Sequence, residues 1–147
     1  MIRRLGPGDE AVLAALARDD AAFDLEEPGR ARDGVSGSAA AAYLSDPHVL
    51  HFVAEEDGAL LGHLLCYVER RRAGNAFQVL LYEIGVREGH RRRGIGGALM
   101  KELDAWMAEH GVATVWVLAD NEGAEAFYAA CGFARDELQA VHMSRSQ

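Results

Sequence analysis

Residues 91–97 have the composition of an anion-binding loop, with a run of arginines followed by closely spaced glycines. An amphipathic segment starts at the same point, so the loop would open a helix. The first turn of a helix has N–H groups without an intrahelical partner, and the helix dipole adds positive potential there. Glycines leave those groups accessible to phosphate, and arginines add charge and paired donors. We predict a pyrophosphate cradle made of Arg91, Arg92, Arg93, Gly94, Ile95, Gly96 and Gly97.

Other phosphate-binding loops fit residues 91–97 less well. The P-loop needs Gly-x4-Gly-Lys followed by Ser or Thr, and the sequence has no such run. The dinucleotide-binding pattern needs a third glycine where this chain has Leu99. Taken alone, the run of charges is also explained by a solvated loop.

A single carboxylate interrupts the apolar run over residues 80–86. Strand alternation would place Glu83 on one face and both Tyr82 and Ile84 on the other. A charge inside such a run is costly unless it lines a cleft or is paired. Glu83 is therefore our candidate for a catalytic base, and an ion pair with a loop arginine is the alternative.

A second candidate group lies on a later apolar stripe, where Ala124, Phe127, Tyr128 and Cys131 recur at helical spacing. The phenol of Tyr128 could donate a proton, and a half-buried core tyrosine is the alternative reading. Asn121 precedes this stripe and is among the best helix N-caps, so capping alone would also explain it.

The histidines and cysteines predict neither a metal centre nor a disulfide framework. Among the six histidines only His48 and His51 are close in sequence, and neither pairs with a Cys or carboxylate at ligand spacing. Cys66 and Cys131 each lie within an apolar segment, which suits a reducing compartment.

The sequence pattern predicts that these residues are positioned by an antiparallel β-meander followed by alternating helices and strands. A helix opens after Pro7-Gly8-Asp9, residues 24–38 are irregular, and Asp57-Gly58 signals a hairpin. This order predicts an α+β domain around a central mixed sheet. Strands are expected over residues 2–5, 48–55, 59–69, 77–86, 112–118, 133–135 and 138–144. Further helices are expected over residues 39–44 and from Gly94 to Gly111, and a last helix carries Ala124 to Cys131 and ends at Gly132.

The composition of the chain argues against several classes of protein, namely those that bind nucleic acid or span or coat a membrane. The 147 residues suit one domain over residues 1–147, and the net charge of −8 argues against nucleic acid or an anionic membrane as partner. No apolar run approaches the roughly 20 residues that a membrane helix needs. We also see no signal peptide at the N-terminus, and therefore expect a cytoplasmic protein.

The order and spacing of these motifs resemble those of the GCN5-related N-acetyltransferases. Arg91-x-x-Gly94-x-Gly96, opening a helix after a strand, is similar to the acyl-CoA motif of that family. Asn121-x-x-Ala124-x-x-Phe127-Tyr128, followed by Cys131-Gly132-Phe133, is similar to its second conserved block. The resemblance implies an αβα-layered α+β fold, whose mixed, mostly antiparallel sheet splays between its fourth and fifth strands. It also implies acetyl-CoA as co-substrate and no metal.

The same resemblance assigns roles to individual residues. Main-chain N–H groups over residues 92–97 would hold the pyrophosphate, and residues 84–86 would pair with the pantetheine arm beside a β-bulge near Glu83 or Gly85. Acetyl transfer would proceed by direct attack of the amine, with Glu83 as base, directly or through water, and Tyr128 as acid. The cofactor-binding residues implied are Ile84, Gly85, Val86, Arg91, Arg92, Arg93, Gly94, Ile95, Gly96, Gly97, Asn121, Ala124 and Phe127.

The acceptor is expected to be a cationic small-molecule amine. Outside residues 87–93, which hold four arginines and one glutamate, the chain carries a net charge of −11. Acidic residues gather in the N-terminal segment that walls the acceptor site in this family. Electrostatic steering then favours a polycation, and a solvated acidic helix end is the alternative. The expected substrate-binding residues are Asp24, Glu26, Glu27 and Tyr82.

A closer resemblance points to aminoglycosides as acceptors. Residues 2–7, 52–62 and 82–86 are similar to the smaller, GCN5-related type of aminoglycoside 3-N-acetyltransferase. The chain departs from that subgroup at Glu83, where an Asp is familiar, and in a shorter segment over residues 121–128. A polyamine, an amino acid and a protein N-terminus stay open as acceptors. A non-catalytic acyl-CoA sensor is the alternative from another class, and a homodimer through the late strands is a further expectation.

Overall fold

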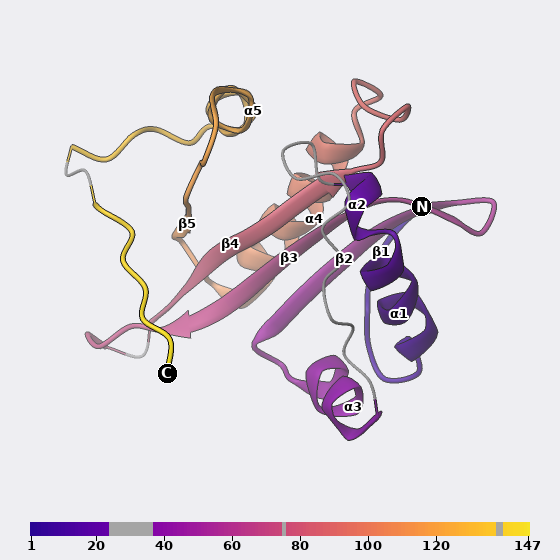
Figure 1. Ribbon diagram of the computed structural model, residues 1–147. Coiled ribbons are helices and arrows are strands. Elements are labelled where there is room, and N and C mark those ends of the chain that lie inside the picture. The colour runs from indigo at the N-terminus through magenta and orange to yellow at the C-terminus, as the bar shows by residue number, and fades with distance from the viewer. Residues whose placement is uncertain (24–36, 75, 138–139) are drawn as a thin grey trace.

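A mixed five-stranded sheet crosses the part of the molecule that the structure describes, namely residues 1–23, 37–74, 76–137 and 140–147 of a computed structural model (Figure 1). Its order is β1-β2-β3-β4-β5, with antiparallel pairing throughout except for the parallel pair β4 and β5. The predicted meander and mixed sheet are confirmed. The strands are β1 (Ile2–Arg4), β2 (Val49–Glu56), β3 (Ala59–Arg70), β4 (Phe77–Val86) and β5 (Val115–Val117).

Helices cover both faces of the sheet and give the αβα layering that the resemblance implied. On one face lie α1 (Glu10–Arg18), α2 (Asp20–Phe23) and α3 (Gly37–Ser45), and on the other lies α4 (Ile95–His110). The last helix, α5 (Glu122–Ala130), follows β5 and stands beyond its end in Figure 1.

Burial of β2 and β3 on both faces fixes their register. Leu50, Phe52 and Ala54 of β2 pack in the core under α4, whereas Val53 packs in the second core with α1 and α3. Because side chains alternate along a strand, a slip of one residue would exchange the two faces. His51 shares the face of Val53 and is 6% exposed.

Turn and cap residues take the backbone geometry that their types favour. Asp57 and Gly58 both have positive φ, at 50° and 79°, as the two-residue hairpin between β2 and β3 requires. Helix α4 is bounded by two left-handed glycines, Gly94 with φ 80° and Gly111 with φ 66°. These two boundaries of α4 are confirmed.

The C-terminal part differs from the prediction. No strand forms in the described residues from 133 onward, so the strands expected over residues 133–135 and 138–144 are wrong there. Val141 and Met143 are each 85% exposed, which means that no neighbouring element buries them. The strand expected over residues 112–118 is confined to Val115–Val117, and Leu118 is 64% exposed. Strand-forming residues without a packed neighbour do not hold a strand.

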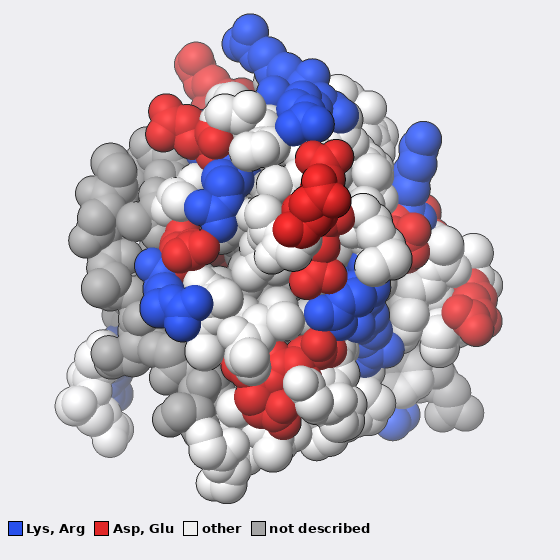
Figure 2. All heavy atoms as spheres, turned by 90° about the vertical axis from the view of Figure 1, so that its right-hand side faces the viewer, with Lys and Arg blue, Asp and Glu red and all other residues white. Residues whose placement is uncertain are grey.

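The distribution of charged side chains and the hydropathy of the helices each exclude one kind of feature in the described part of the chain. Acidic and basic side chains are interspersed on the face that bears the N-terminus (Figure 2), so that face has no uniformly basic surface for a polyanion. Among the described helices, none combines the length and apolar character needed to cross a bilayer.

Candidate active site

The sheet opens between β4 and β5. Their parallel pairing runs from Val79 with Val115 to Leu81 with Val117, and it stops there although β4 continues to Val86. The two strands diverge beyond this point in Figure 1. The expected splay is therefore confirmed. Within the described residues, the final part of β4 keeps an edge with no paired strand, where an extended ligand could bond to the main chain.

A β-bulge lies at the same level of β4. Leu65 pairs with Glu83 and its neighbour Cys66 pairs with Leu81, which leaves Tyr82 as the extra residue. A bulge bends a strand and redirects its side chains. This is the bulge that was expected near Glu83, and it directly precedes that residue.

The bulge overturns the predicted alternation along β4. Leu81 and Ile84 both pack against the core under α4, although they are three positions apart and regular alternation would place them on opposite faces. The two residues between them must then face the other side of the sheet. Tyr82 packs edge-on against Tyr67 of β3 there, with ring centroids 5.4 Å apart. The prediction that Tyr82 and Glu83 occupy opposite faces is wrong.

The carboxylate of Glu83 lies beside a buried histidine. Its Oε1 is 3.7 Å from Nε2 of His63, and the two side chains are 25% and 6% exposed. Gly85 makes room for this arrangement, since a Cβ at that position would lie 3.0 Å from Nε2 of His63 and 2.9 Å from Cβ of Phe23. Glu83 thus stands on the face covered by α2 and α3.

Helix α5 brings Tyr128 toward the splay from the opposite face of the sheet. Tyr128 is 8% exposed and belongs to the core under α4, with ring centroids 5.5 Å from those of both Phe127 and Phe133. Burial raises the pKa of Tyr128 to about 12, and neighbouring acidic groups that include Asp120 and Glu83 add to this effect. The phenol therefore keeps its proton at neutral pH and can donate it.

The start of α5 is capped as predicted. The Asn121 side-chain Oδ1 accepts a hydrogen bond from the Ala124 N–H at 2.7 Å, and its Nδ2 donates to Asp120 at 3.1 Å. Phe127 joins α5 to α4, because a Cβ at Gly96 would meet the Phe127 ring at 3.0 Å. Asn121, Ala124 and Phe127 are thus all used in holding α5.

The N-terminus of α4 forms an open cradle. Its N-cap is Gly94, which has no side chain to cap the helix, and the first helical bond runs from the Ala98 N–H to the Gly94 carbonyl at 2.9 Å. A Cβ at Gly94 or at Gly97 would meet no atom within 4 Å. The space beside Gly94 and Gly97 is therefore open, and a helix N-terminus without a side-chain cap suits the pyrophosphate of a CoA ester.

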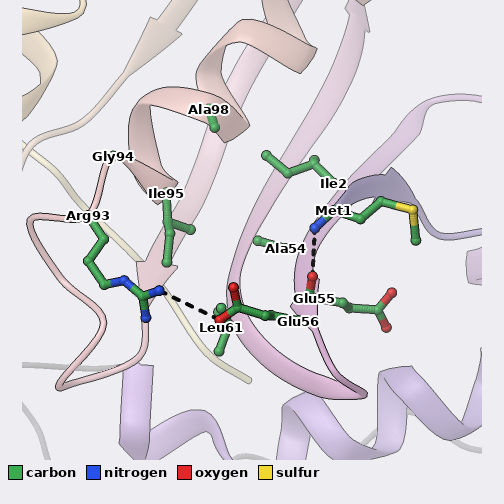
Figure 3. A pocket seen from close by; sticks show the side chains of 10 residues that line it. All are labelled: Met1, Ile2, Ala54, Glu55, Glu56, Leu61, Arg93, Gly94, Ile95 and Ala98. Atoms are coloured by element: carbon green, nitrogen blue, oxygen red, sulfur yellow. Dashed lines mark hydrogen bonds and ion pairs between the residues drawn. The ribbon is translucent and has the colours of Figure 1, made fainter.

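The three loop arginines make different contacts. The Arg91 Nε donates to the Val86 carbonyl at 3.0 Å and ties the loop to the end of β4. Arg92 has a positive φ of 61° and an exposed side chain. The Arg93 Nη2 lies 3.6 Å from Glu56, across a pocket of about 260 Å³ beside β1 and β2 (Figure 3). The guanidinium of Arg93 is thus on the side of α4 away from the splay.

The expected acceptor wall is described only in part. Asp24, Glu26 and Glu27 lie outside the described residues. Tyr82 is described and is 59% exposed. Asp19, which belongs to the same acidic segment, is paired with Arg87 at 2.7 Å.

Residue-by-residue reading of the sequence missed a buried histidine pair beside Glu83. His51 pairs across the strands with Leu65 and His63 pairs with Val53, which makes the two histidines diagonal neighbours on one face. The signal was present in the sequence: both alternate with apolar residues in strands that the Asp-Gly hairpin joins. Within the described residues, no group of three or more His, Cys, Asp or Glu side chains could hold a metal ion.

Comparison with known sequences gives a family and several relatives, of which two follow. The sequence model of the acetyltransferase (GNAT) family matches residues 13–133. A mycothiol acetyltransferase from Kineococcus radiotolerans is 35% identical over 138 residues, which cover 88% of this chain and 40% of that protein. The N-alpha-acetyltransferase RimI from Mycobacterium tuberculosis is 31% identical over 134 residues, which cover 89% of this chain and 83% of that protein.

Comparison with solved structures also finds an acetyltransferase. An aminoglycoside acetyltransferase from an uncultured soil metagenomic sample superposes with a TM-score of 0.85 and 25% sequence identity. The match covers 99% of this chain and 98% of that one. The chain thus spans the whole of this structural neighbour but only 40% of the mycothiol acetyltransferase.

Proposed function

The chain belongs to the acetyltransferase (GNAT) family, and we propose that its described site transfers an acetyl group from acetyl-CoA to a primary amine of a cationic small molecule. In this proposal residues 1–147 act as a single acetyltransferase domain. The observation that carries it is the meeting of three features at the end of β4: an open helix N-terminus, an unpaired strand edge, and the carboxylate of Glu83.

The cofactor would be held mainly by main-chain groups. Acetyl-CoA supplies the acetyl group as a thioester. The first-turn N–H groups of α4 would bind the pyrophosphate, with the exposed cation of Arg92 beside them. The edge of β4 over residues 84–86 would hydrogen-bond to the pantetheine amides. Arg91 would act indirectly, by holding the loop against the Val86 carbonyl.

Two side chains would handle the protons. An amine with a pKa near about 10 is mostly protonated at neutral pH and must lose a proton before it can attack. Glu83 would bind the cation and accept that proton, directly or through water. Tyr128, whose pKa is raised to about 12, would donate its proton to the departing thiolate.

The acceptor class that we favour is an aminoglycoside. The several ammonium groups of an aminoglycoside suit a chain of net charge −8, and Glu83 lies with Tyr67 and Tyr82 on the face of the sheet covered by α2 and α3. The superposition on an aminoglycoside acetyltransferase over nearly the full length of both chains supports this choice. An α-amino group is the second candidate, because the relative named as an N-alpha-acetyltransferase matches over 83% of its length.

The test follows CoA thiol released from acetyl-CoA with an aminoglycoside, with spermidine, and with a peptide that has a free N-terminus. We expect turnover with the aminoglycoside. Turnover with the peptide alone would replace the acceptor class and keep the reaction. Glu83→Gln and Tyr128→Phe should each lower kcat by about 10²-fold or more while CoA affinity is unchanged. A non-catalytic CoA sensor would turn over none of the three acceptors and would be indifferent to both substitutions.

A further inference from the structure

We propose that His63 positions the Glu83 carboxylate, and that Tyr43 and His51 hold His63 in a single tautomer. The four side chains would then act as one chain of polar contacts, two of them hydrogen bonds and the last the ion-pair contact to Glu83. This inference rests on the proposed function, in which Glu83 is the base. Tyr43 and His51 are positioning residues, since neither would contact a substrate.

Three consecutive contacts form the chain. The Tyr43 hydroxyl lies 2.9 Å from Nδ1 of His51, and Nε2 of His51 lies 3.3 Å from Nδ1 of His63. Nε2 of His63 then lies 3.7 Å from Oε1 of Glu83. Each residue comes from a different element, in the order α3, β2, β3 and β4. The chain therefore begins on α3 and then runs across three neighbouring strands of the sheet.

With both histidines neutral, the proton count gives this chain one direction. An ionised Glu83 can only accept, so Nε2 of His63 must carry the proton that faces it. Nδ1 of His63 is then an acceptor for the Nε2–H of His51. Nδ1 of His51 in turn accepts the hydroxyl proton of Tyr43. One ionised carboxylate thus fixes both tautomers, and the tyrosine closes the far end.

Packing keeps His63 in place. Its ring meets the Phe23 ring edge-on at 5.2 Å, and Gly85 lies directly against its Nε2, as described above. His51 and His63 are 6% and 5% exposed, so neither ring has room to turn toward solvent. The packing therefore holds the His63 ring in one place beside the carboxylate.

Titratable groups on several elements feel the charge of Glu83. Among the described residues, besides His63, these include Tyr43 on α3, Tyr67 on β3 and, from the opposite face of the sheet, Tyr128 on α5. All three are phenols whose pKa is raised mainly by burial, so they are neutral near pH 7. Burial and the neighbouring His63 lower the pKa of His51 to about 3, so His51 is neutral as well.

The pH profile of kcat/KM tests the chain, because its acidic limb reports the base of the free enzyme. Tyr43→Phe and His51→Leu break the chain without touching Glu83. We expect each to displace the acidic limb, because His63 is then no longer held with one ring nitrogen fixed beside the carboxylate. His51→Gln keeps an amide N–H near the position of Nε2 and should return the limb toward that of the wild type.

A matched control and a fourth variant separate the two proposals. His48→Leu alters a histidine whose side chain is 56% exposed, and it should leave the profile unchanged. If Glu83→Gln keeps wild-type kcat, Glu83 is not the base and the proposed function of this residue fails. If Glu83→Gln loses turnover while folded Tyr43→Phe and His51→Leu keep the wild-type profile, the chain alone is overturned.

Ring nitrogen chemical shifts provide a test that needs no turnover. In the wild type at neutral pH we expect His51 and His63 each to be protonated at Nε2 and unprotonated at Nδ1. In Tyr43→Phe the preference should weaken, because Nδ1 of His51 loses its donor. A wild-type His63 that is protonated at Nδ1 would overturn the inference.

Discussion

Several single residues of the site have a structural contact that is independent of any ligand. Asn121 caps α5, Arg91 anchors the loop to Val86, and Arg93 reaches Glu56. Their identities in the sequence pointed to binding, but their side-chain contacts are within the protein. The functional signal of such residues therefore lies in what their main chain and position provide. Substitution of Asn121 or Arg91 would therefore change folding and binding together.

His51 makes a specific contribution to the pH dependence of stability. Its pKa is lowered from 6.5 to about 3, mainly by burial, so between these values the unfolded chain binds a proton that the native state does not. The free energy of unfolding should then fall as the pH drops from 7 to 5, by about 2 kcal/mol from this group. Urea titrations at the two pH values measure the difference.

His51→Gln removes that titration and should reduce the pH dependence by the same amount. His48→Gln, at an exposed position, is the matched control and should retain the wild-type slope. Equal slopes for all three proteins would contradict the assignment of this effect to His51.

Among the elements, the most predictable from sequence were those marked by a clear hydrophobic pattern and by glycines at their ends. The bounds of β4 and the start and end of α4 follow from an apolar run, an amphipathic stripe and two flanking glycines. The bulge at Tyr82 was anticipated only from the family resemblance, because nothing in its local residue pattern distinguishes a bulge from regular alternation. The strands expected after Gly132 failed because their apolar residues find no partner surface. The His51–His63 contact was missed because it depends on the register between two strands.

The two neighbouring glycines in the first turn of α4 should behave differently. Gly97→Ala places its Cβ in open space at a helical position, so the free energy of unfolding should stay the same or rise by up to about 1 kcal/mol. The same methyl would occupy the space above the cradle and should raise the KM for acetyl-CoA. Thermal unfolding and steady-state kinetics measure the two effects separately.

Gly96→Ala is the comparison variant. Its Cβ would meet the Phe127 ring at 3.0 Å, so this change should destabilise the contact between α4 and α5. An unchanged KM for acetyl-CoA in Gly97→Ala would argue against pyrophosphate binding at this turn.

For the whole molecule, the relevant property is its charge of −8. A multiply charged cationic acceptor should be drawn to it at low ionic strength, and salt screens that attraction over about 10 Å at 0.1 M. We expect the KM for an aminoglycoside to rise several-fold between 20 mM and 300 mM salt. The KM for a peptide with one amine should rise much less. Equal salt dependence for the two acceptors would remove the electrostatic argument for a polycation.

The edge of β4 beyond Leu81, which pairs with no strand of the described residues, has a practical consequence for the purified protein. A strand edge with free main-chain groups can pair with the same edge of another molecule. Preparations stripped of CoA should therefore self-associate more as they are concentrated, and CoA in slight excess should suppress this. Light scattering during concentration, with and without CoA, would measure the difference. The ligand would then act during purification and storage as a temporary sixth strand that keeps the molecules apart.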